Sequence, residues 1–477
     1  MKTAGDKSNT AAAQSPLQRG VALFRESLRD SDTDYTRGPI GRALGLLAIP
    51  MMLEMSMESI FAVVDIAFVS RLGTDAIATI GITEALISVL YAIAVGLGMG
   101  VTAMVSRRIG AGEREAAARV AGQAIWVGAG LSLLIGIPGA FYAADMLRLM
   151  GASDGVVETG TGFAAVLLGG SASIIYLFLL NAAFRGAGDA SIALRSLVLA
   201  NSLNIILDPC LIFGLGPFPE LGVTGAAWAT TIGRSIGVLY QLWHLFDGRG
   251  RLQFHFRNLA LHPRMMARML VISAGGISQF LIATSSWIII MRIVAMYGST
   301  AVAAYTIGLR ILEFVWLPSW GLGNAAATLV GQNLGAGQPQ RAEQSTWRAA
   351  RYNTAFQTCI GIFLLTSAPF IAGLFTNDPE VLRIGTDCLR ILAIGAPAYA
   401  IGMIVTQAIN GAGDTGTPTA IDFVGFWLLQ IPLAYWLATE MSLDQNGAFW
   451  AITIAETFIT VLSVIVFRRG RWKRTIA

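Results

Sequence analysis

Three carboxylates lie inside a long apolar stretch near the amino terminus, where charged side chains are costly. Glu54 and Glu58 are four residues apart, and Asp65 follows seven residues after Glu58. Spacings of four and seven place all three on one stripe of a helix. Acids retained in an apolar segment usually face a cavity. The stripe is therefore a candidate site for a proton, a cation or a cationic substrate.

A second polar group occurs in "NSLNIILDP" at residues 201–209. Asn204 and Asp208 are four residues apart, so the amide and the carboxylate point the same way. Together with a hydroxyl group, such oxygens suit a hard cation such as Na⁺. Carboxylates crowded together without a cation bind a proton instead. These residues are therefore compatible with either Na⁺ or H⁺ as the bound ion.

The composition of the chain indicates that these acids lie in membrane helices. Of 477 residues, 55% are hydrophobic and only 13% are charged, and the mean hydropathy is +0.63. A soluble chain of this length needs more charge to cover its surface. We therefore expect an all-α integral membrane protein. The net charge of +4 gives no reason to expect a nucleic-acid partner.

A membrane crossing needs about 20 mostly apolar residues. Twelve segments qualify: 44–70, 78–105, 120–144, 162–184, 193–214, 224–246, 270–296, 301–330, 354–375, 388–409, 418–438 and 447–467. The two termini then face the same side. Of the 33 Lys and Arg residues, 26 lie in the tail, the even-numbered connections and the carboxyl terminus. The positive-inside rule therefore predicts cytosolic termini.

The twelve segments form two similar halves. A shift of 225 positions brings "GLGMGVTAMVSRRIGAGE" (96–113) onto "GLGNAAATLVGQNLGAGQ" (321–338), and "RGAGD" (185–189) onto "NGAGD" (410–414). Near the end of each half, "GAAWATTI" (225–232) matches "GAFWAITI" (447–454) at a shift of 222. Six segments per copy give both copies the same orientation. We expect 12 transmembrane helices in two six-helix bundles related by a parallel internal repeat.

This repeat divides the chain into parts with different roles. We expect a cytosolic tail (1–43), a first lobe (44–246), a cytosolic linker (247–268), a second lobe (269–467) and a basic cytosolic carboxyl terminus (468–477). Two facing bundles suggest a central cleft that alternates between inward-open and outward-open states. The repeat therefore favours a transporter over a channel, which is more often assembled from several chains.

Several motifs resemble those of the multidrug and toxic compound extrusion (MATE) transporters. They are the glycine-rich exit of the second segment with its copy in the eighth, "VVDIAFVSRLGTDAIA", "RGAGD", "NSLNIILDP" and "GVTGAAWATTIG". The resemblance covers about residues 40–470. It implies a secondary antiporter in the inner membrane of a prokaryote, exporting cationic, amphipathic compounds in exchange for H⁺ or Na⁺. It also implies a monomer without a cofactor.

The resemblance assigns the coupling ion to four residues of the first lobe. Asp65, Asn204 and Asp208 match the polar residues of the first and fifth helices, and Thr230 matches a threonine of the sixth. Thr231 is the alternative, because the preceding loop leaves the register open. No metal site is expected beyond Na⁺ held by these four residues.

Other polar residues are candidates for the substrate or a proton. They are Glu58, Glu54 and Asp422, and for Glu54 structural pairing with a neighbouring helix is an equal alternative. Asp422 and Glu456 could meet a cationic substrate or each other. Arg310 and Glu313, three residues apart, are expected to pair.

The second half lacks the counterparts of two expected ion ligands. Ile290 and Ile431 occupy the places of Asp65 and Asp208, so we place the cation site in the first lobe. The leading alternative function is a flippase for lipid-linked saccharides, which usually needs a strongly cationic cavity for phosphates. No nucleotide loop, metal-ligand cluster or Ser–His arrangement occurs, so we do not expect an enzyme.

Overall fold

The computed structural model describes residues 16–29, 33–69, 72, 74–248 and 250–475. The side chains of residues 16, 17, 60–63, 65–67, 74, 75 and 77 lie outside this description. Asp65 is one of them. Its backbone belongs to a helix, and its expected role stays a prediction.

The described part of the first half is helical. After α1 (Pro16–Ser27) come α2 (Ile40–Val69), α3 (Thr74–Gly110), α4 (Arg114–Phe141), α5 (Ala143–Leu149), α6 (Asp154–Gly169), α7 (Ser171–Ala187), α8 (Ala190–Phe213) and α9 (Val223–Phe246). A short 3₁₀ helix, η2 (Phe256–Leu259), lies in the connection to the second half.

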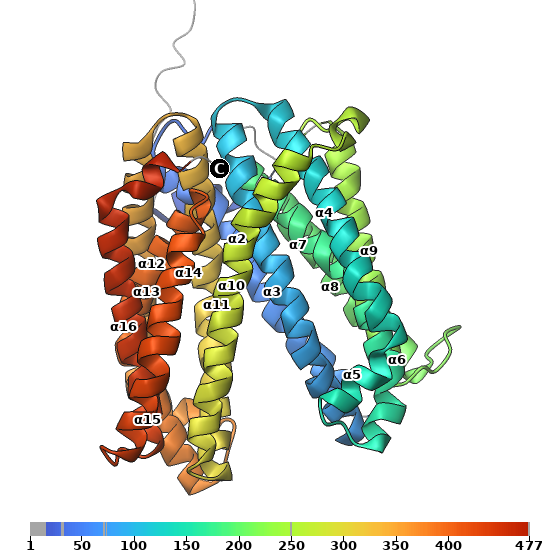
Figure 1. Cartoon of the computed structure of the whole chain (residues 1–477), viewed down its shortest axis with the longest axis vertical. Coiled ribbons are helices and arrows are strands. Elements are labelled where there is room, and N and C mark those ends of the chain that lie inside the picture. The colour runs from blue at the N-terminus through green and yellow to red at the C-terminus, as the bar shows by residue number, and fades with distance from the viewer. Residues whose placement is uncertain (1–15, 30–32, 70–71, 73, 249, 476–477) are drawn as a thin grey trace, which may run out of the picture.

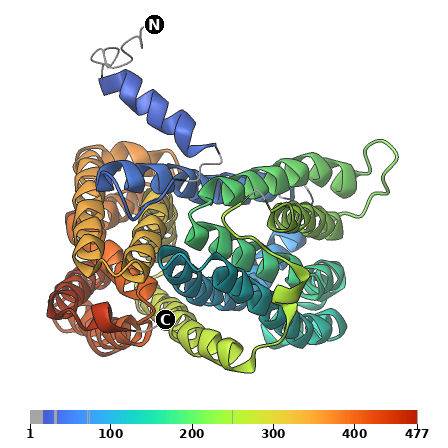
Figure 2. The same cartoon turned by 90° about the horizontal axis from the view of Figure 1, so that it is seen from above.

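The second half repeats this pattern. It contains α10 (Pro263–Ala295), α11 (Ser299–Gly335), α12 (Pro339–Gly373), α13 (Pro379–Gly411), α14 (Gly416–Asp422), the π-helical segment η3 (Phe423–Gln430), α15 (Ile431–Thr439), α16 (Gln445–Arg469) and the 3₁₀ helix η4 (Arg471–Arg474). The two halves form bundles that lie side by side (Figures 1 and 2). The predicted fold class is thereby confirmed.

Within the described residues, the predicted segments fall on helices, with three differences. The segment predicted at 120–144 passes from α4 into α5 at Tyr142, the segment at 162–184 is interrupted between α6 and α7 at Gly170, and the segment at 418–438 consists of α14, η3 and α15. Among the described residues, eleven stretches are long and apolar enough to cross a membrane. The predicted segment that fails this criterion corresponds to α9, which carries Arg234, Gln241 and His244.

The first helix of each half packs along the second helix of the other half. Thus α2 lies along α11, and α10 lies along α3. Glycines permit these close approaches: a Cβ atom at Gly96 would lie 2.4 Å from the backbone nitrogen of Ile277, and one at Gly321 would lie 2.6 Å from that of Met52. The 225-residue shift takes Gly96 to Gly321 and Met52 to Ile277, so the two contacts are equivalent in the repeat. The interface between the bundles therefore has approximate two-fold symmetry.

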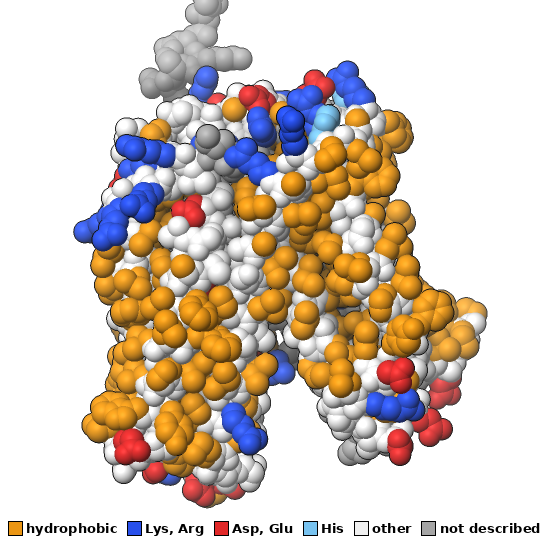
Figure 3. Space-filling model, viewed as in Figure 1, with side chains coloured by type: hydrophobic (Ala, Val, Ile, Leu, Met, Phe, Trp, Pro, Cys, Tyr) orange, Lys and Arg blue, Asp and Glu red, His pale blue; other side chains and the backbone are white. Residues whose placement is uncertain are grey.

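The bundles meet near the end that carries the termini and separate toward the opposite end (Figure 1). Figure 3 shows a hollow between them at the separated end, and Lys and Arg side chains gathered at the end where they meet. At the closed end, α3 and α11 approach through Gly110 and Gly335, which are also 225 residues apart.

Substitution of these two glycines is expected to open the closed end. A Cβ atom at Gly110 would lie 1.9 Å from the carbonyl oxygen of Gln332, and one at Gly335 would lie 2.0 Å from that of Arg107. Because backbone atoms cannot move aside individually, Gly110→Ala should shift the population away from this conformation. Spin labels at positions 115 and 340, in a background without native cysteines, should report longer distances.

A matched control is Gly112→Ala. Gly112 follows the same helix, but a Cβ atom there meets no atom within 4 Å. Its φ of +78° makes alanine locally strained without affecting the contact between α3 and α11. Equal distance distributions for Gly110→Ala and the parent protein would show that the contact does not hold this end closed.

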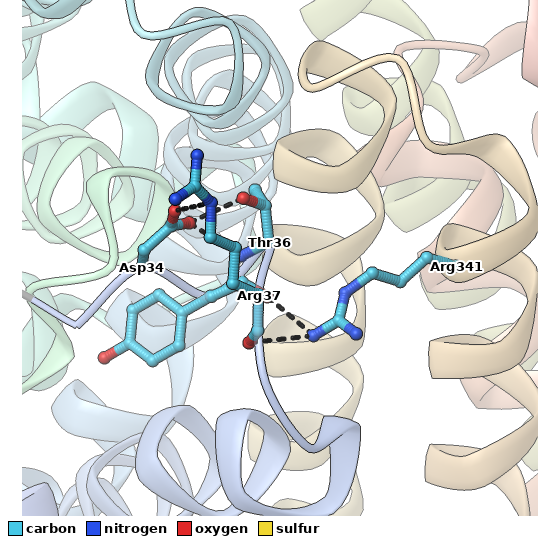
Figure 4. A network of polar contacts seen from close by, with 5 residues as sticks. Asp34, Thr36, Arg37 and Arg341 are labelled. Carbon is cyan, nitrogen blue, oxygen red and sulfur yellow. Dashed lines mark hydrogen bonds and ion pairs between the residues drawn. The ribbon is translucent and has the colours of Figure 1, made fainter.

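Residues 34–37, which we call the N-terminal strut, bridge the two bundles at the closed end (Figure 4). Arg341 of α12 donates through Nη2 to the carbonyl oxygens of Tyr35 (3.2 Å) and Arg37 (3.1 Å). On the other side, the Tyr35 hydroxyl donates to the carbonyl oxygen of Gly188 at 3.2 Å. The Arg251 guanidinium lies 4.7 Å from the centre of the Tyr35 ring.

The strut is held in shape by the carboxylate of Asp34. It accepts hydrogen bonds from the backbone nitrogen (2.9 Å) and hydroxyl (2.6 Å) of Thr36, and it lies 3.2 Å from Nε of Arg37. Burial raises the pKa of Asp34, but these hydrogen bonds and the charges of Arg37 and Arg251 outweigh burial, so the pKa lies below its ordinary value of 3.8. The stabilisation is therefore present at neutral pH and is lost only as the pH falls through the lowered pKa.

Candidate functional site

Three of the four expected coupling residues meet between α8 and α9. Nδ2 of Asn204 donates to Oγ1 of Thr230 at 3.0 Å and lies 3.4 Å from Oδ1 of Asp208. Asn204 and Asp208 are 2% and 0% exposed. Because they are one turn apart on α8, the two side chains share one face of that helix, and Asn204 links Asp208 to Thr230 on α9. The structure thus brings together a carboxylate, an amide and a hydroxyl away from solvent.

This arrangement contains oxygen atoms suited to a small cation. Oδ1 of Asn204 is buried and has no hydrogen-bond partner among the described residues. No group of three His, Cys, Asp or Glu side chains suited to a metal occurs in the described part of the chain. A cation here would rest on one described carboxylate with amide and hydroxyl oxygens, a donor set that suits Na⁺ better than a transition metal.

The helices that carry Asp65 and Asp208 are neighbours. α2 packs against α8, and Nδ2 of Asn201 donates to the carbonyl oxygen of Met57 at 3.3 Å.

The two candidate threonines of α9 have different neighbours in the structure. Thr230 accepts from Asn204, whereas Thr231 lies against Gly170, at the junction of α6 and α7.

Glu54 has structural partners. Its Oε1 lies 2.6 Å from Nη1 of Arg185 and accepts from Nδ2 of Asn181 at 3.0 Å. Gln241 in turn donates to Oδ1 of Asn181. Glu54 and Arg185 are 1% and 9% exposed. The cluster therefore joins α2, α7 and α9 in the interior of the first lobe.

The repeat contains an uncharged version of the same cluster. At the 225-residue shift, Glu54 corresponds to Gln279 and Arg185 to Asn410. The amides of Gln279 and Asn410 donate to each other, both at 3.1 Å. Since the second lobe keeps the connection without charge, the geometry favours the structural reading of Glu54.

Glu58 lies near the positively charged side chain of Arg234. Its Oε1 lies 3.7 Å from Nη2 of Arg234, which donates to the Tyr91 hydroxyl at 2.6 Å. The Arg234 guanidinium also lies 5.6 Å from the centre of the Tyr91 ring. Arg234 did not stand out in the sequence, although an arginine within a membrane segment is itself a signal of a buried partner.

In the second lobe, Nη1 of Arg310 lies 3.4 Å from Oε2 of Glu313, which confirms the predicted pairing of these two residues. Asp422 and Glu456 both line a cavity of about 420 Å³. Its wall includes aromatic rings of α10, α11, η3 and α13: Phe280, Trp287, Trp316, Trp320, Tyr399 and Phe426. Asp422 lies directly before η3, and π-helical segments often mark functional sites.

The geometry defines a polytopic membrane protein with two repeated bundles, polar clusters inside both, and an acidic aromatic cavity in the second. The MatE family model matches the chain twice, at residues 50–210 and 277–436. These matches cover more than half of the chain, one in each half, so the chain belongs to the MatE family, the MATE transporters.

Similar proteins span nearly the whole chain. A "Probable multidrug resistance protein NorM" from Thermotoga maritima is 26% identical over 459 residues, covering 95% of this chain and 97% of the relative. An "FAD transporter" from Shewanella oneidensis is 28% identical, covering 83% and 88%. The solved structure "Crystal structure of MATE in the straight conformation" has a TM-score of 0.87 at 26% identity, covering 94% and 100%.

A second solved structure, described as the outward-facing conformation of a multidrug resistance MATE family transporter, has a TM-score of 0.86 at 25% identity, covering 96% and 99%. The fold of this chain is therefore that of a MATE transporter.

Proposed function

We propose that this protein is a secondary active antiporter that exports cationic, amphipathic compounds across the inner membrane of a prokaryote in exchange for H⁺ or Na⁺. The observation that carries the proposal is the buried cluster of Asp208, Asn204 and Thr230. A carboxylate so placed is stabilised by binding a cation or a proton, and binding of either ion can therefore drive local repacking of the helices.

The proposed cycle alternates between two arrangements of the bundles. With both termini cytosolic, the hollow of Figure 3 faces outward. In this state Asp208, joined by Asp65 from the neighbouring helix, takes up the ion, and the resulting repacking releases the compound. In the inward-open state the ion leaves and another compound enters. The ion and the compound must prefer different states, because equal affinity would shift no equilibrium.

The charge of the described cavity supports a cationic cargo. No Lys, Arg or His is among the described residues that line it. A lipid-linked saccharide carries phosphates, as does FAD, the compound in the name of the Shewanella relative. Phosphates would face Asp422 and Glu456 without a compensating cation, so neither cargo is favoured here.

The test is transport by the purified protein in liposomes loaded with a fluorescent organic cation. A Na⁺ gradient and a pH gradient are imposed separately, with ionophores collapsing the membrane potential. The proposal predicts cation movement driven by one of these gradients against its own concentration gradient. If neither gradient drives movement while the protein remains folded, the antiport proposal is wrong.

A further inference from the structure

Helix α1 lies beside the two bundles and has no part in the proposed transport cycle. Figure 2 shows it extending sideways from the edge of the bundles, across the direction of the membrane helices. Two contacts attach it to the beginning of α2. Nη2 of Arg42 lies 2.6 Å from Oε1 of Glu26, and a Cβ atom at Gly45 would lie 2.8 Å from Cδ2 of Leu23. The position of α1 is therefore fixed relative to a membrane helix.

These contacts also set the height of α1 relative to the membrane. The stretch of α2 that is apolar and long enough to cross a membrane begins at Ile40. At a rise of about 1.5 Å per residue, Gly45 lies less than about 10 Å from that start. Helix α1 is therefore level with the boundary between the hydrocarbon of the membrane and the lipid headgroups.

The faces of α1 differ in chemistry as this position requires. Successive residues are about 100° apart around a helix. Val21 and Phe24 share one face beside the contact of Leu23 with α2, and they are 47% and 44% exposed. Arg19 and Ala22, both exposed, lie on the other side of the helix. A helix that lies along a membrane with such faces turns the apolar one toward the acyl chains.

The charges around this apolar face favour a lipid surface over another protein. Arg19, Arg25 and Arg29 are exposed, and the acid of the helix, Glu26, already pairs with Arg42. Anionic headgroups attract arginines placed in this way. A second copy of the chain docked through α1 would instead bring like charges together.

We propose that α1 is an interfacial helix that binds the membrane surface at the closed end of the bundles. Val21 and Phe24 enter the boundary of the acyl chains, and the arginines at positions 19, 25 and 29 contact anionic headgroups. The proposal does not depend on the coupling ion or on the exported compound.

The first test measures the depth of α1 in the membrane. A spin label replaces Val21, Phe24 or, as the control on the opposite side, Ala22 in the full-length protein without native cysteines, in nanodiscs containing phosphatidylglycerol. We expect labels at 21 and 24 to be relaxed mainly by O₂, which partitions into lipid, and the label at 22 mainly by a water-soluble nickel complex. Nickel access at 24 would overturn the proposal, and so would shielding from both reagents, which would show that protein covers this face.

The second test measures the preference for anionic lipid. Energy transfer runs from a fluorophore at position 22 to phosphatidylglycerol or phosphatidylcholine carrying the same chain-linked acceptor. We expect at least about twofold enrichment of phosphatidylglycerol. The triple variant Arg19→Gln, Arg25→Gln, Arg29→Gln should lose it with unchanged thermal stability, because these side chains are exposed. The control, Arg383→Gln, removes an exposed cation at the start of α13 and should keep the enrichment. Equal transfer to both lipids in the parent protein would refute the binding of anionic headgroups.

Discussion

Replacement of Asp208 by Asn is expected to reduce gradient-driven efflux by at least about tenfold, since an amide neither binds a proton at neutral pH nor balances a cation. The substitution keeps the size of the side chain and its contact with Asn204. The protein should therefore fold. The measurement is uptake of a fluorescent cation into liposomes under each imposed gradient.

Three further variants make this experiment more specific. Asp154→Asn removes an exposed acid at the start of α6 and should transport normally. Thr230→Ser keeps the hydroxyl that accepts from Asn204, whereas Thr230→Val removes it with little change in volume. If Na⁺ is the ion, the valine variant should need more Na⁺ and the serine variant should not. Full gradient-driven transport by Asp208→Asn would remove this residue from the coupling mechanism.

Separation of Glu54 from Arg185 is expected to cause the largest loss of stability. The two side chains lie 2.6 Å apart in the interior, and removal of one leaves the other charged and buried. Breaking such a pair costs about 3–5 kcal/mol of unfolding free energy. Arg185→Asn and Glu54→Gln should each lower the midpoint of thermal unfolding in detergent.

The repeat supplies the compensating variant. Glu54→Gln with Arg185→Asn copies the Gln279–Asn410 pair of the second lobe and should recover most of the lost stability. Glu113→Gln, which breaks an exposed pair with Arg108, is the control and should change stability by less than about 1 kcal/mol. A stable double variant that fails to transport would show that Glu54 acts in transport, contrary to the structural role favoured here.

The helices and the repeat could be predicted because they depend on local properties of the chain. Apolar length marks a crossing wherever the helix packs, and a constant shift marks a repeat. The predicted boundaries were less accurate: α12 begins at Pro339 instead of 354, since polar turns outside the apolar core remain helical. α10 begins at Pro263, within the predicted linker.

The sites depend on helix rotation and on packing, which the sequence specifies only indirectly. Which of Thr230 and Thr231 contacts Asn204 depends on the rotation of α9 relative to α8, because the two threonines have different neighbours. The second-lobe cavity could not be predicted, because its existence depends on how the side chains of several helices pack and where they leave space. The sequence nevertheless indicates a difference between the lobes at this place, because Glu456 corresponds to Arg234 when the halves are aligned at the 222-residue shift.

The N-terminal strut resists the rocking of the bundles that the proposed antiport requires. If the closed end opens, Gly188 of the first lobe moves away from Arg341 of the second, and the strut cannot keep its contacts with both. At least one set of these contacts would then break in each cycle. In the proposed mechanism, residues 34–37 would thus contribute to the activation barrier of turnover, although they lie remote from the bound ion or compound.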